Sequence, residues 1–376
     1  MIRLTIPSIE EDDLQVTRET LASGFLVQGP RVAEFEKSIA SYIGVRHVIA
    51  VSNCTAALHL SLLALDVRAG DLVLVTTYSW PATANVIELC GAQPIFVDVE
   101  PDTFNMNPEL LAETLDRLMA TAETARRVKA IIPVHTFGQM ADMTAIMEIA
   151  NQHGIPVIED AACALGAKWE GRQAGTWGVV GCFSFHPRKA ITTGEGGAII
   201  TTNDQLARKL RALRNHGQDP EATSPDFIMP GFNYRMTEIQ AAFGVTQMKK
   251  LDRIISARRQ LAHQYDSLLE NDPVLVPVVP AASWPVYQSY VTLLPEDVSP
   301  RRAEVIHQLK ERGIETNIGT WHMPLTTYFR TRYGYRAGDF PSTDKVFVSS
   351  LTLPLYEKLN YEEQCTVIDR LREVIK

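Results

Sequence analysis

The sequence predicts an α/β fold with a mostly parallel, seven-stranded sheet flanked by helices, and two observations lead to this prediction. Short apolar runs recur along the first 200 residues, and their hydrophobicity is continuous, as expected for strands that are buried on both faces. Helical patterns separate most of these runs, which is typical of a parallel sheet covered by helices. The predicted strands are HVIAV at 47–51, DLVLV at 71–75, PIFVDV at 94–99, KAIIPVH at 129–135, GIPVIED at 154–160, VVGCFSF at 179–185 and GGAIITT at 196–202.

The connections between these runs indicate the direction of the strands. Helical stretches are expected at 55–65, 142–153 and 204–214. Only a loop separates the last two predicted strands, and it is too short for a helical crossover. We therefore expect one of those two strands to be antiparallel.

The C-terminal third has a different pattern. From about Met236 a long helix is expected, because apolar residues recur at three- and four-residue spacing. A Pro-rich stretch follows, then a helix at about 301–312, an aromatic-rich loop at 318–340 and a closing helix at about 361–375.

This change of pattern predicts two domains. We expect a large domain over residues 1–255, with an N-terminal arm at 1–30, and a smaller C-terminal α/β domain over residues 256–376. The boundary then lies inside the long helix, near residue 255.

Composition excludes several classes of protein. The net charge is −8, from 36 basic and 44 acidic residues, so no basic surface argues for nucleic acid. No apolar run is long enough to span a membrane, and the N-terminus lacks the apolar core of a signal peptide. The five cysteines are scattered without metal-ligand spacing. We expect a cytoplasmic protein with reduced thiols and no metal.

Two polar residues stand beside the ends of predicted strands. Lys189 lies between the last two strands and is followed by the flexible sequence TTGEGG. Asp160 closes the strand IPVIED, where an unpaired carboxylate is costly to bury. The alternatives are a solvated loop lysine and a helix N-cap for the residues after Asp160.

Two further segments follow strand ends. In SNCTAAL at 52–58, Thr55 and Ala56 open a helix whose free amides suit a phosphate. Trp80 follows the strand DLVLV; its ring suits either stacking on a flat cofactor or ordinary core packing. In open α/β sheets ligands gather at the carboxyl ends of strands. An amine, a carboxylate, a phosphate cradle and an aromatic surface together match pyridoxal phosphate.

Seven motifs occur in a fixed order from about Thr17 to the C-terminus. They are GFLVQGPRVAEFE (24–36), VSNCTAALHL (51–60), GAQPIFVDVEPDTFNM (91–106), IIPVHTFGQMADM (131–143), VIEDAACALGA (157–167), CFSFHPRKAITTGEGG (182–197) and FNYRMTEIQAAFG (232–244). In this set and order the chain resembles the DegT/DnrJ/EryC1/StrS family of sugar aminotransferases, which have pyridoxal-phosphate fold type I.

The resemblance implies roles for residues at the cofactor ring. Lys189 would bind the cofactor covalently, Asp160 would hold the pyridine nitrogen, and Trp80 would cover the ring. One position departs from the family: Cys163 stands where Gln or His usually lies near the ring hydroxyl. Cys is a poorer hydrogen-bond partner, so water or a neighbouring group is expected to replace that contact.

The resemblance also implies how the phosphate is held. Thr55, Ala56 and the Ser184 hydroxyl would bind it within one chain. In the family, the asparagine of the NYRMTE motif, here Asn233, reaches the phosphate of the neighbouring subunit. The expected assembly is therefore a homodimer with sites at the subunit interface.

Four residues are candidates for substrate binding. Arg188 and Arg235 suit the diphosphate of a sugar nucleotide, with ordinary surface ion pairs as the alternative. His186, beside Lys189, and His322, in WHMPL, are candidates to contact the sugar. His135, at a strand end, is expected to be a structural neighbour of the site rather than a catalyst.

The expected reaction is transfer of an amino group from an amino acid, most simply L-glutamate, to a nucleotide-linked keto-sugar. The ending ITTGEGG at 191–197 resembles family members that aminate C4, whereas C3 enzymes more often have NLGAxGDGG. The setting expected from the family is synthesis of surface polysaccharide or lipopolysaccharide. Alternatives are a C3 enzyme and an inosose or antibiotic-sugar aminotransferase. A dehydratase, which would replace Lys189 by His, and a non-enzymatic regulator, which would lose Lys189 or Asp160, fit less well.

Overall fold

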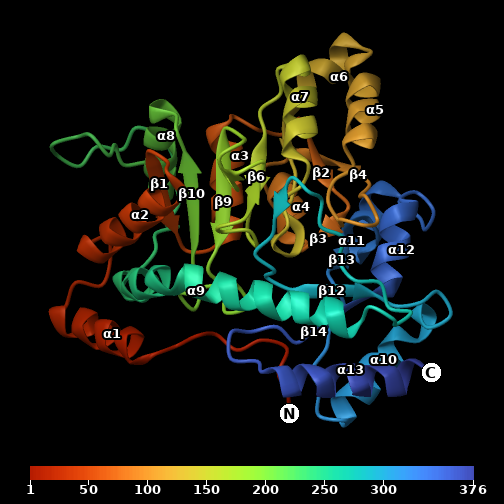
Figure 1. Cartoon of the computed structure of the whole chain (residues 1–376). Helices are drawn as coiled ribbons and strands as arrows, with labels where there is room; N and C mark the ends of the chain where they lie inside the picture. Colours follow the sequence, from red (N-terminus) through yellow and green to blue (C-terminus); the bar gives the residue numbers. More distant parts are fainter.

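All seven predicted strands are present in one sheet. A computed structural model describes residues 1–376, and Figure 1 shows the order of its elements. The seven strands are β1 (His47–Val51), β2 (Leu72–Thr76), β4 (Gln93–Val97), β5 (Val128–Ile132), β6 (Ile158–Asp160), β9 (Val180–Ser184) and β10 (Gly197–Thr201).

The sheet has the order β4-β2-β5-β6-β9-β10-β1. Hydrogen-bonded ladders form the halves β4-β2-β5 and β6-β9-β10-β1, and parallel bridges from Ile131 to Val157 and from Val134 to Asp160 join them. β2 is parallel to β4 and β5, and β6 is parallel to β9. β10 is antiparallel to both neighbours, as predicted for one of the last two strands. The carboxyl ends of β1, β2, β6 and β9 therefore lie at one edge of the sheet.

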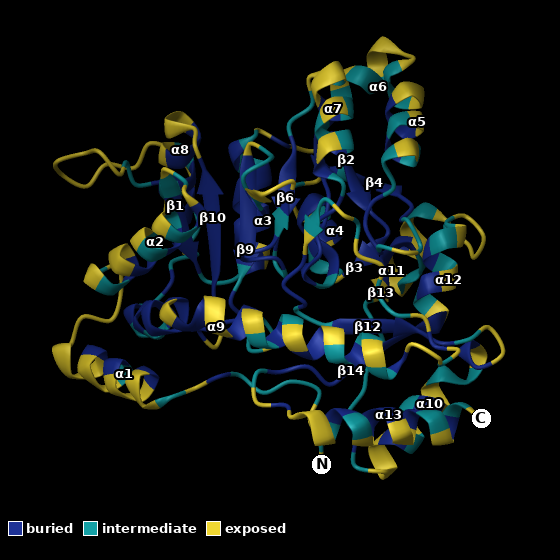
Figure 2. Cartoon of the chain, viewed as in Figure 1, coloured by how far each residue is buried: buried dark blue, intermediate teal, exposed yellow.

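Helices cover both faces of the sheet. The helices of the N-terminal two thirds are α1 (Glu11–Ser23), α2 (Pro30–Ile43), α3 (Cys54–Ala64), α4 (Ala82–Leu89), α5 (Pro108–Met119), α6 (Ala122–Arg127), α7 (Met143–His153), α8 (Asp204–Arg214) and α9 (Glu238–Leu268), with a 3-10 turn at Thr136–Gly138. Alternate residues of a strand face opposite sides. Val48 and Ala50 of β1 thus pack with α2, α5, α7 and α9, whereas Ile49 and Val51 pack with α3, α4 and α8. Figure 2 shows the strands between these layers as buried.

The three helices predicted between strands begin and end within one residue of the expected positions. Each starts at a polar N-cap: Asn53, Asp142 and Asn203 accept a hydrogen bond from the amide three residues later. Such caps satisfy amides that have no partner inside the helix. Local sequence therefore determines where these helices begin.

The C-terminal part forms a smaller α/β unit. Its elements are β12 (Tyr290–Leu293), β14 (Ser350–Leu353), α10 (Arg302–Glu311), α12 (Pro341–Ser349) and α13 (Tyr361–Ile375), with a 3-10 turn at Ser299–Arg301. β12 and β14 pair in antiparallel fashion, and Figure 1 shows α13 and α10 below them. The helices predicted at 301–312 and 361–375 are confirmed.

The prediction of a loop at 318–340 was partly wrong. This segment contains β13 (Trp321–His322), a 3-10 turn at Met323–Leu325 and the short helix α11 (Thr327–Tyr333). β13 pairs with β3 (Tyr78–Ser79), and Phe329 of α11 packs against Phe96 of β4. Contacts with distant residues, rather than local propensity, stabilise these elements. Three further two-residue strands are β7 (Lys168–Trp169), β8 (Arg172–Gln173) and β11 (Ser283–Trp284).

The long helix α9 contributes to two hydrophobic clusters. Its residues up to Ile255 pack in the cluster below the sheet, and its residues from Leu261 onward pack in the C-terminal cluster. Ile2 and Ile6 also pack against the C-terminal cluster, although they belong to the predicted N-terminal arm. The domain boundary near residue 255 stays a prediction. No helix of the chain is both long and apolar enough to cross a membrane.

Candidate active site

Lys189 lies in the loop that joins β9 to β10, at the carboxyl edge of the sheet. Its side chain is half-buried, and Nζ donates a hydrogen bond to Cys163 Sγ over 3.0 Å. Burial alone would lower the pKa of Lys189, but its interactions with Cys163 and Asp160 raise it overall. The alternative of a solvated loop lysine is therefore wrong, because the amine points toward other polar groups of this edge.

Asp160 ends β6 and is only 3% exposed. Its carboxylate accepts hydrogen bonds from Thr83 Oγ1 at 2.7 Å and from the Ala162 amide at 3.2 Å, and it forms no ion pair. Burial raises the pKa of Asp160, although the hydrogen bond from Thr83 opposes this. No helix begins after β6, so the N-cap alternative is wrong. A buried carboxylate with only neutral hydrogen-bond donors suits a cationic ligand group.

Thr83 was missed by the sequence analysis. It lies in the first turn of α4, is 1% exposed and binds both Asp160 and Ser79. The sequence contained little indication of this role, because a threonine in the first turn of a helix is common and does not by itself predict a contact with a distant aspartate. Thr83 orients the carboxylate on which the site depends.

The N-terminus of α3 lies at the same edge. The Asn53 side chain accepts the Ala56 amide at 2.8 Å, whereas the Cys54 and Thr55 amides have no acceptor within the chain. A Cβ at Gly197 would lie 2.5 Å from the Asn53 carbonyl carbon, so only glycine lets β10 pass this close to α3. Thr55 therefore offers a free donor to an anion, but the Ala56 amide is already bound.

Trp80 lies directly after β3 and is 64% exposed. The alternative of core packing is therefore wrong. The ring is available to a flat ligand at the edge where Asp160 ends its strand, and its role over the cofactor stays a prediction.

The turn before Lys189 contains three more candidates. Ser184 Oγ accepts the His186 amide at 3.4 Å, and His186 Nδ1 accepts the Arg188 amide at 3.2 Å. Burial lowers the pKa of His186. Arg188 is exposed and has no acidic partner, so the ion-pair alternative fails for it. The structure thus brings these three residues together with Lys189.

Asn233 and Arg235 lie in the extended segment before α9. The Asn233 side chain is exposed and makes no hydrogen bond within the chain. Arg235 donates to Asn215 Oδ1 at 2.6 Å, and its backbone bridges to Val51 at the end of β1. Arg235 forms no ion pair, and its bridge to Val51 places it close to the start of α3, whereas the backbone of Asn233 bridges to Asn215.

The other two histidines singled out in the sequence, His135 and His322, are buried. His135 is fully buried and lies 2.9 Å from Glu159 through Nε2, which confirms its structural role. His322 is 2% exposed; its Nε2 lies 3.1 Å from Asp344 Oδ1 with poor hydrogen-bond geometry. Burial lowers the pKa of His322. Its ring lies against Phe340 and Phe347, and its role toward the sugar stays a prediction.

This arrangement fits pyridoxal phosphate. Asp160 offers an unpaired buried carboxylate for a protonated ring nitrogen, Lys189 offers the amine, and α3 offers free amides to a phosphate. The close packing of Gly197 on the Asn53 and Cys54 backbone fixes the start of α3 at this edge of the sheet. The site is therefore that of an enzyme in which a lysine and a cofactor act together.

Comparison with known proteins identifies the family. The model of the DegT/DnrJ/EryC1/StrS aminotransferase family matches residues 7–372, and the chain belongs to this family. It is 37% identical over 381 residues to GDP-perosamine synthase of Caulobacter vibrioides, covering 100% of this chain and 98% of that protein. It is 34% identical to the spore coat polysaccharide biosynthesis protein SpsC of Bacillus subtilis, covering 99% of this chain and 96% of that protein.

Solved structures support the same assignment. The putative sugar aminotransferase Spr1654 from Streptococcus pneumoniae in its PMP form has a TM-score of 0.92 at 27% identity, with 100% of this chain and 99% of that chain covered. The same protein has also been solved in a PLP form. The predictions of fold type I, of an aminotransferase and of pyridoxal phosphate as cofactor are confirmed.

Proposed function

We propose that the protein is a sugar aminotransferase that moves an amino group from L-glutamate to a nucleotide-linked keto-sugar. The observation that carries the proposal is the contact between Lys189 and Cys163 beside the uncompensated carboxylate of Asp160. The similarity to GDP-perosamine synthase and to the putative sugar aminotransferase Spr1654 supports a sugar as acceptor. Amination at C4 rests on the ITTGEGG ending of the lysine motif. The proposed setting, a cytoplasmic route to surface polysaccharide or lipopolysaccharide, rests on the family.

The residues of the chain have distinct roles in this proposal. Pyridoxal phosphate, when bound, supplies an electron-withdrawing ring that stabilises negative charge on the carbon next to the reacting nitrogen. Asp160 keeps the ring nitrogen protonated through its buried carboxylate. Lys189 Nζ takes the proton from the α carbon of the donor and delivers it on the other side of the same nitrogen. Thr55, with the Ser184 hydroxyl, holds the phosphate at the start of α3.

Charge favours a nucleotide-linked acceptor. A protein of net charge −8 repels an anionic substrate unless basic groups are concentrated at the site. Arg188 is exposed and free of acidic partners directly beside Lys189, and Arg235 lies beside the end of β1 with only a neutral partner. A guanidinium without a carboxylate suits phosphate oxygens.

The test is a comparison of acceptors with L-glutamate as donor. We expect turnover with a 4-keto nucleotide sugar, less with the 3-keto isomer, and little with the free sugar or scyllo-inosose. Arg235→Ala should lower kcat/KM for the nucleotide sugar by roughly ten- to hundredfold, the range for a charge-assisted hydrogen bond. Equal rates with the free sugar would exclude the nucleotide-linked acceptor. Turnover by Lys189→Ala would exclude the assignment of the site.

We also propose that the enzyme is a homodimer in which Asn233 binds the partner's phosphate. The unpaired, exposed amide of Asn233 supports this, as do the exposed apolar residues Phe25, Leu26 and Val27 of the N-terminal arm. Asn233→Ala should weaken retention of the cofactor more than it weakens folding. Light scattering and cofactor absorbance test this, and a monomer with full cofactor occupancy would contradict it.

A further inference from the structure

The backbone of the lysine loop is bound by three glutamine side chains. Gln240 Nε2 donates to the Glu195 carbonyl at 2.7 Å, and Gln247 Oε1 accepts the Thr192 amide at 3.3 Å. Both glutamines lie on α9. The third, Gln288, lies in the segment before β12 and donates from Nε2 to the Arg188 carbonyl at 3.0 Å.

Gln288 contacts the loop closest to the reacting amine. The Arg188 carbonyl belongs to the peptide bond that ends in the Lys189 nitrogen, and Gln288 is the only side chain that donates to it. The Lys189 amide is bound on its other side by the His186 carbonyl, at 2.8 Å. The peptide that carries Lys189 is therefore oriented from one direction by its own turn and from the other by Gln288.

Gln288 is itself held firmly in place. Arg258 of α9 is 2% exposed and donates from Nη1 to the carbonyls of Tyr287, at 3.3 Å, and Gln288, at 3.0 Å. Arg258 has no carboxylate partner, so these carbonyls are its main compensation for burial. A side chain at 288 thus projects from a backbone that is fixed at both carbonyls.

The same segment lies against the other partner of Lys189. The Val286 amide donates to the Gly138 carbonyl at 2.9 Å. A Cβ at Gly138 would lie 2.8 Å from the Gln288 nitrogen and 3.1 Å from the Cys163 carbonyl oxygen. Gly138 therefore lies between the Gln288 backbone and the Cys163 carbonyl, so residues 286–288 are linked to Cys163 through Gly138 and to Lys189 through the Arg188 carbonyl.

We propose that Gln288 is a positioning residue that sets where Lys189 Nζ lies relative to Cys163 and Asp160. Through Arg258 and β12 it makes this placement depend on the C-terminal unit. The proposal rests on the proposed role of Lys189 in proton transfer, and it goes beyond that role by naming what holds the lysine.

The test uses three variants of the full-length holoenzyme and a matched control. Gln288→Ala removes the side chain, Gln288→Glu keeps its shape but removes the donor, and Gln288→Lys retains a donor. Gln308→Ala is the control, because Gln308 lies half-buried on α10 and its side chain bonds only to Glu304. Three quantities are measured: the rate at which cofactor-free protein binds pyridoxal phosphate covalently at position 189, trapped with borohydride; the pH midpoint of the absorbance of lysine-bound cofactor; and kcat and KM for the half-reaction with L-glutamate.

We expect Gln288→Ala and Gln288→Glu to slow trapping and to lower kcat about three- to tenfold, with KM for glutamate little changed. The pH midpoint should also move away from that of the wild type, because the lysine nitrogen bonded to the cofactor is displaced from the groups that surround it. Gln288→Lys should restore at least half of the trapping rate, and Gln308→Ala should match the wild type.

Two results would overturn the proposal: a Gln288→Glu enzyme with wild-type trapping, kcat and pH midpoint, or a Gln288→Lys enzyme as impaired as Gln288→Ala. If Gln288→Ala does not fold, the isosteric variant Gln288→Glu still tests whether the donor at position 288 is needed. Trapping needs no substrate, so it tests Gln288 even if L-glutamate and every sugar acceptor fail. Failure of the substrates in the wild type would instead count against the proposed function.

Discussion

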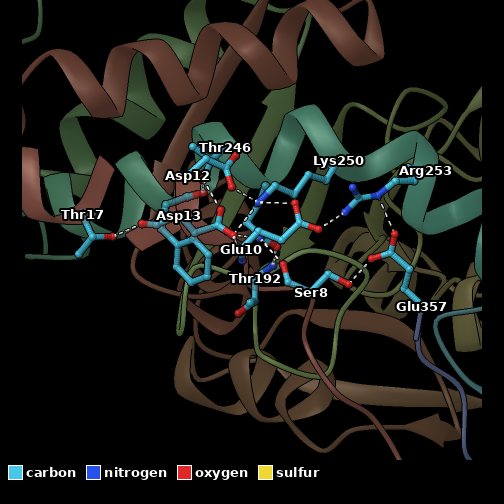
Figure 3. Close-up of polar contacts among 12 residues, drawn as sticks. Ser8, Glu10, Asp12, Asp13, Thr17, Thr192, Thr246, Lys250, Arg253 and Glu357 are labelled. Carbon is cyan, nitrogen blue, oxygen red and sulfur yellow. Dashed lines mark hydrogen bonds and ion pairs between the residues drawn. The ribbon is translucent and has the colours of Figure 1, made fainter. Parts of the chain in front are cut away.

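Two aspartates are almost equally buried but have opposite surroundings. Asp13, at the start of α1, is 2% exposed, and its carboxylate is 2.6 Å from Lys250 Nζ and accepts further bonds from Thr246 and Gln247 (Figure 3). Burial alone would raise the pKa of Asp13, but the hydrogen bonds from Lys250 and Thr246 lower it. Asp160 has neutral donors only, and burial raises its pKa.

The comparison distinguishes two roles of a buried carboxylate. Asp13 stabilises the fold, whereas Asp160 is available to bind a cationic group of a ligand. Around Asp13, Lys250 also binds Asp12 at 2.6 Å, and Arg253 binds both Glu10 and Glu357 at 2.6 Å (Figure 3). This network ties the start of the chain to α9 and is complete within the protein. Asp160 has no cation bonded to its carboxylate, although the charge of Lys189 lowers its pKa somewhat, so a bonded positive charge is left for the cofactor to supply.

The largest effect is expected from Asp160→Asn. Its kcat for the half-reaction with L-glutamate should fall on the order of 10³-fold, because an amide does not keep the ring nitrogen protonated. The cofactor-free variant should be at least as stable as the wild type, since a buried uncompensated charge is removed. Stopped-flow kinetics and urea unfolding measure the two effects. If Asp160→Asn were less stable than the wild type but fully active, Asp160 would have the structural role that we assign to Asp13.

Lys250→Met is expected to show the opposite pattern. It leaves Asp13 buried without a cation and should lower the free energy of unfolding by about 3 kcal/mol, with kcat per folded molecule unchanged. Adding Asp13→Asn should recover part of this loss, because the unpaired charge is then gone. Urea unfolding of both single variants and of the double variant gives the coupling. Additive losses in the double variant would show that the two side chains act independently.

The pH dependence of stability should also differ in sign. Asp13 has a folded pKa below its ordinary value of 3.8, so it contributes stability above that pH and loses it as the pH falls through the folded pKa. Asp160 has a folded pKa above 3.8, so the folded state binds the extra proton and stability falls as pH rises between those two values. Urea unfolding of cofactor-free Asp13→Asn and Asp160→Asn from about pH 3 to about pH 8 checks both signs. If the free energy of unfolding of the two variants depended on pH in the same way, this expectation would be contradicted.

The smallest effect is expected from Arg253→Ala. Arg253 is half-exposed and binds Glu10 and Glu357 at the rim of the same network. Exposed ion pairs are screened, so the loss should stay below about 1 kcal/mol and shrink further in high salt. Thermal unfolding at two salt concentrations measures it. A loss as large as that of Lys250→Met would mean that the network acts as one cooperative unit.

What the sequence could predict depended on whether a feature is local. The seven strands and the helices with polar caps were predictable, because continuous apolar runs and cap residues act within a few positions. Lys189 and Asp160 were predictable because both stand next to strand ends. The bond from Thr83 to Asp160 joins residues 77 positions apart, and that from Lys250 to Asp13 joins residues 237 apart. Such pairs depend on tertiary packing, as does the short helix α11, and no local pattern indicates them.

The reversed direction of β10 has a consequence for the movement of Lys189. Because β10 runs antiparallel to β9, the lysine lies in a hairpin-like connection and not at the start of a crossover helix. At a helix N-terminus the macrodipole would disfavour an ammonium group, and swinging the side chain would disturb the first turn. In the hairpin-like connection a change of dihedral angles between Lys189 and Gly194, whose φ is +82°, breaks no helical hydrogen bond. The fold thus lets its most chemically active side chain move without unwinding any of its helices.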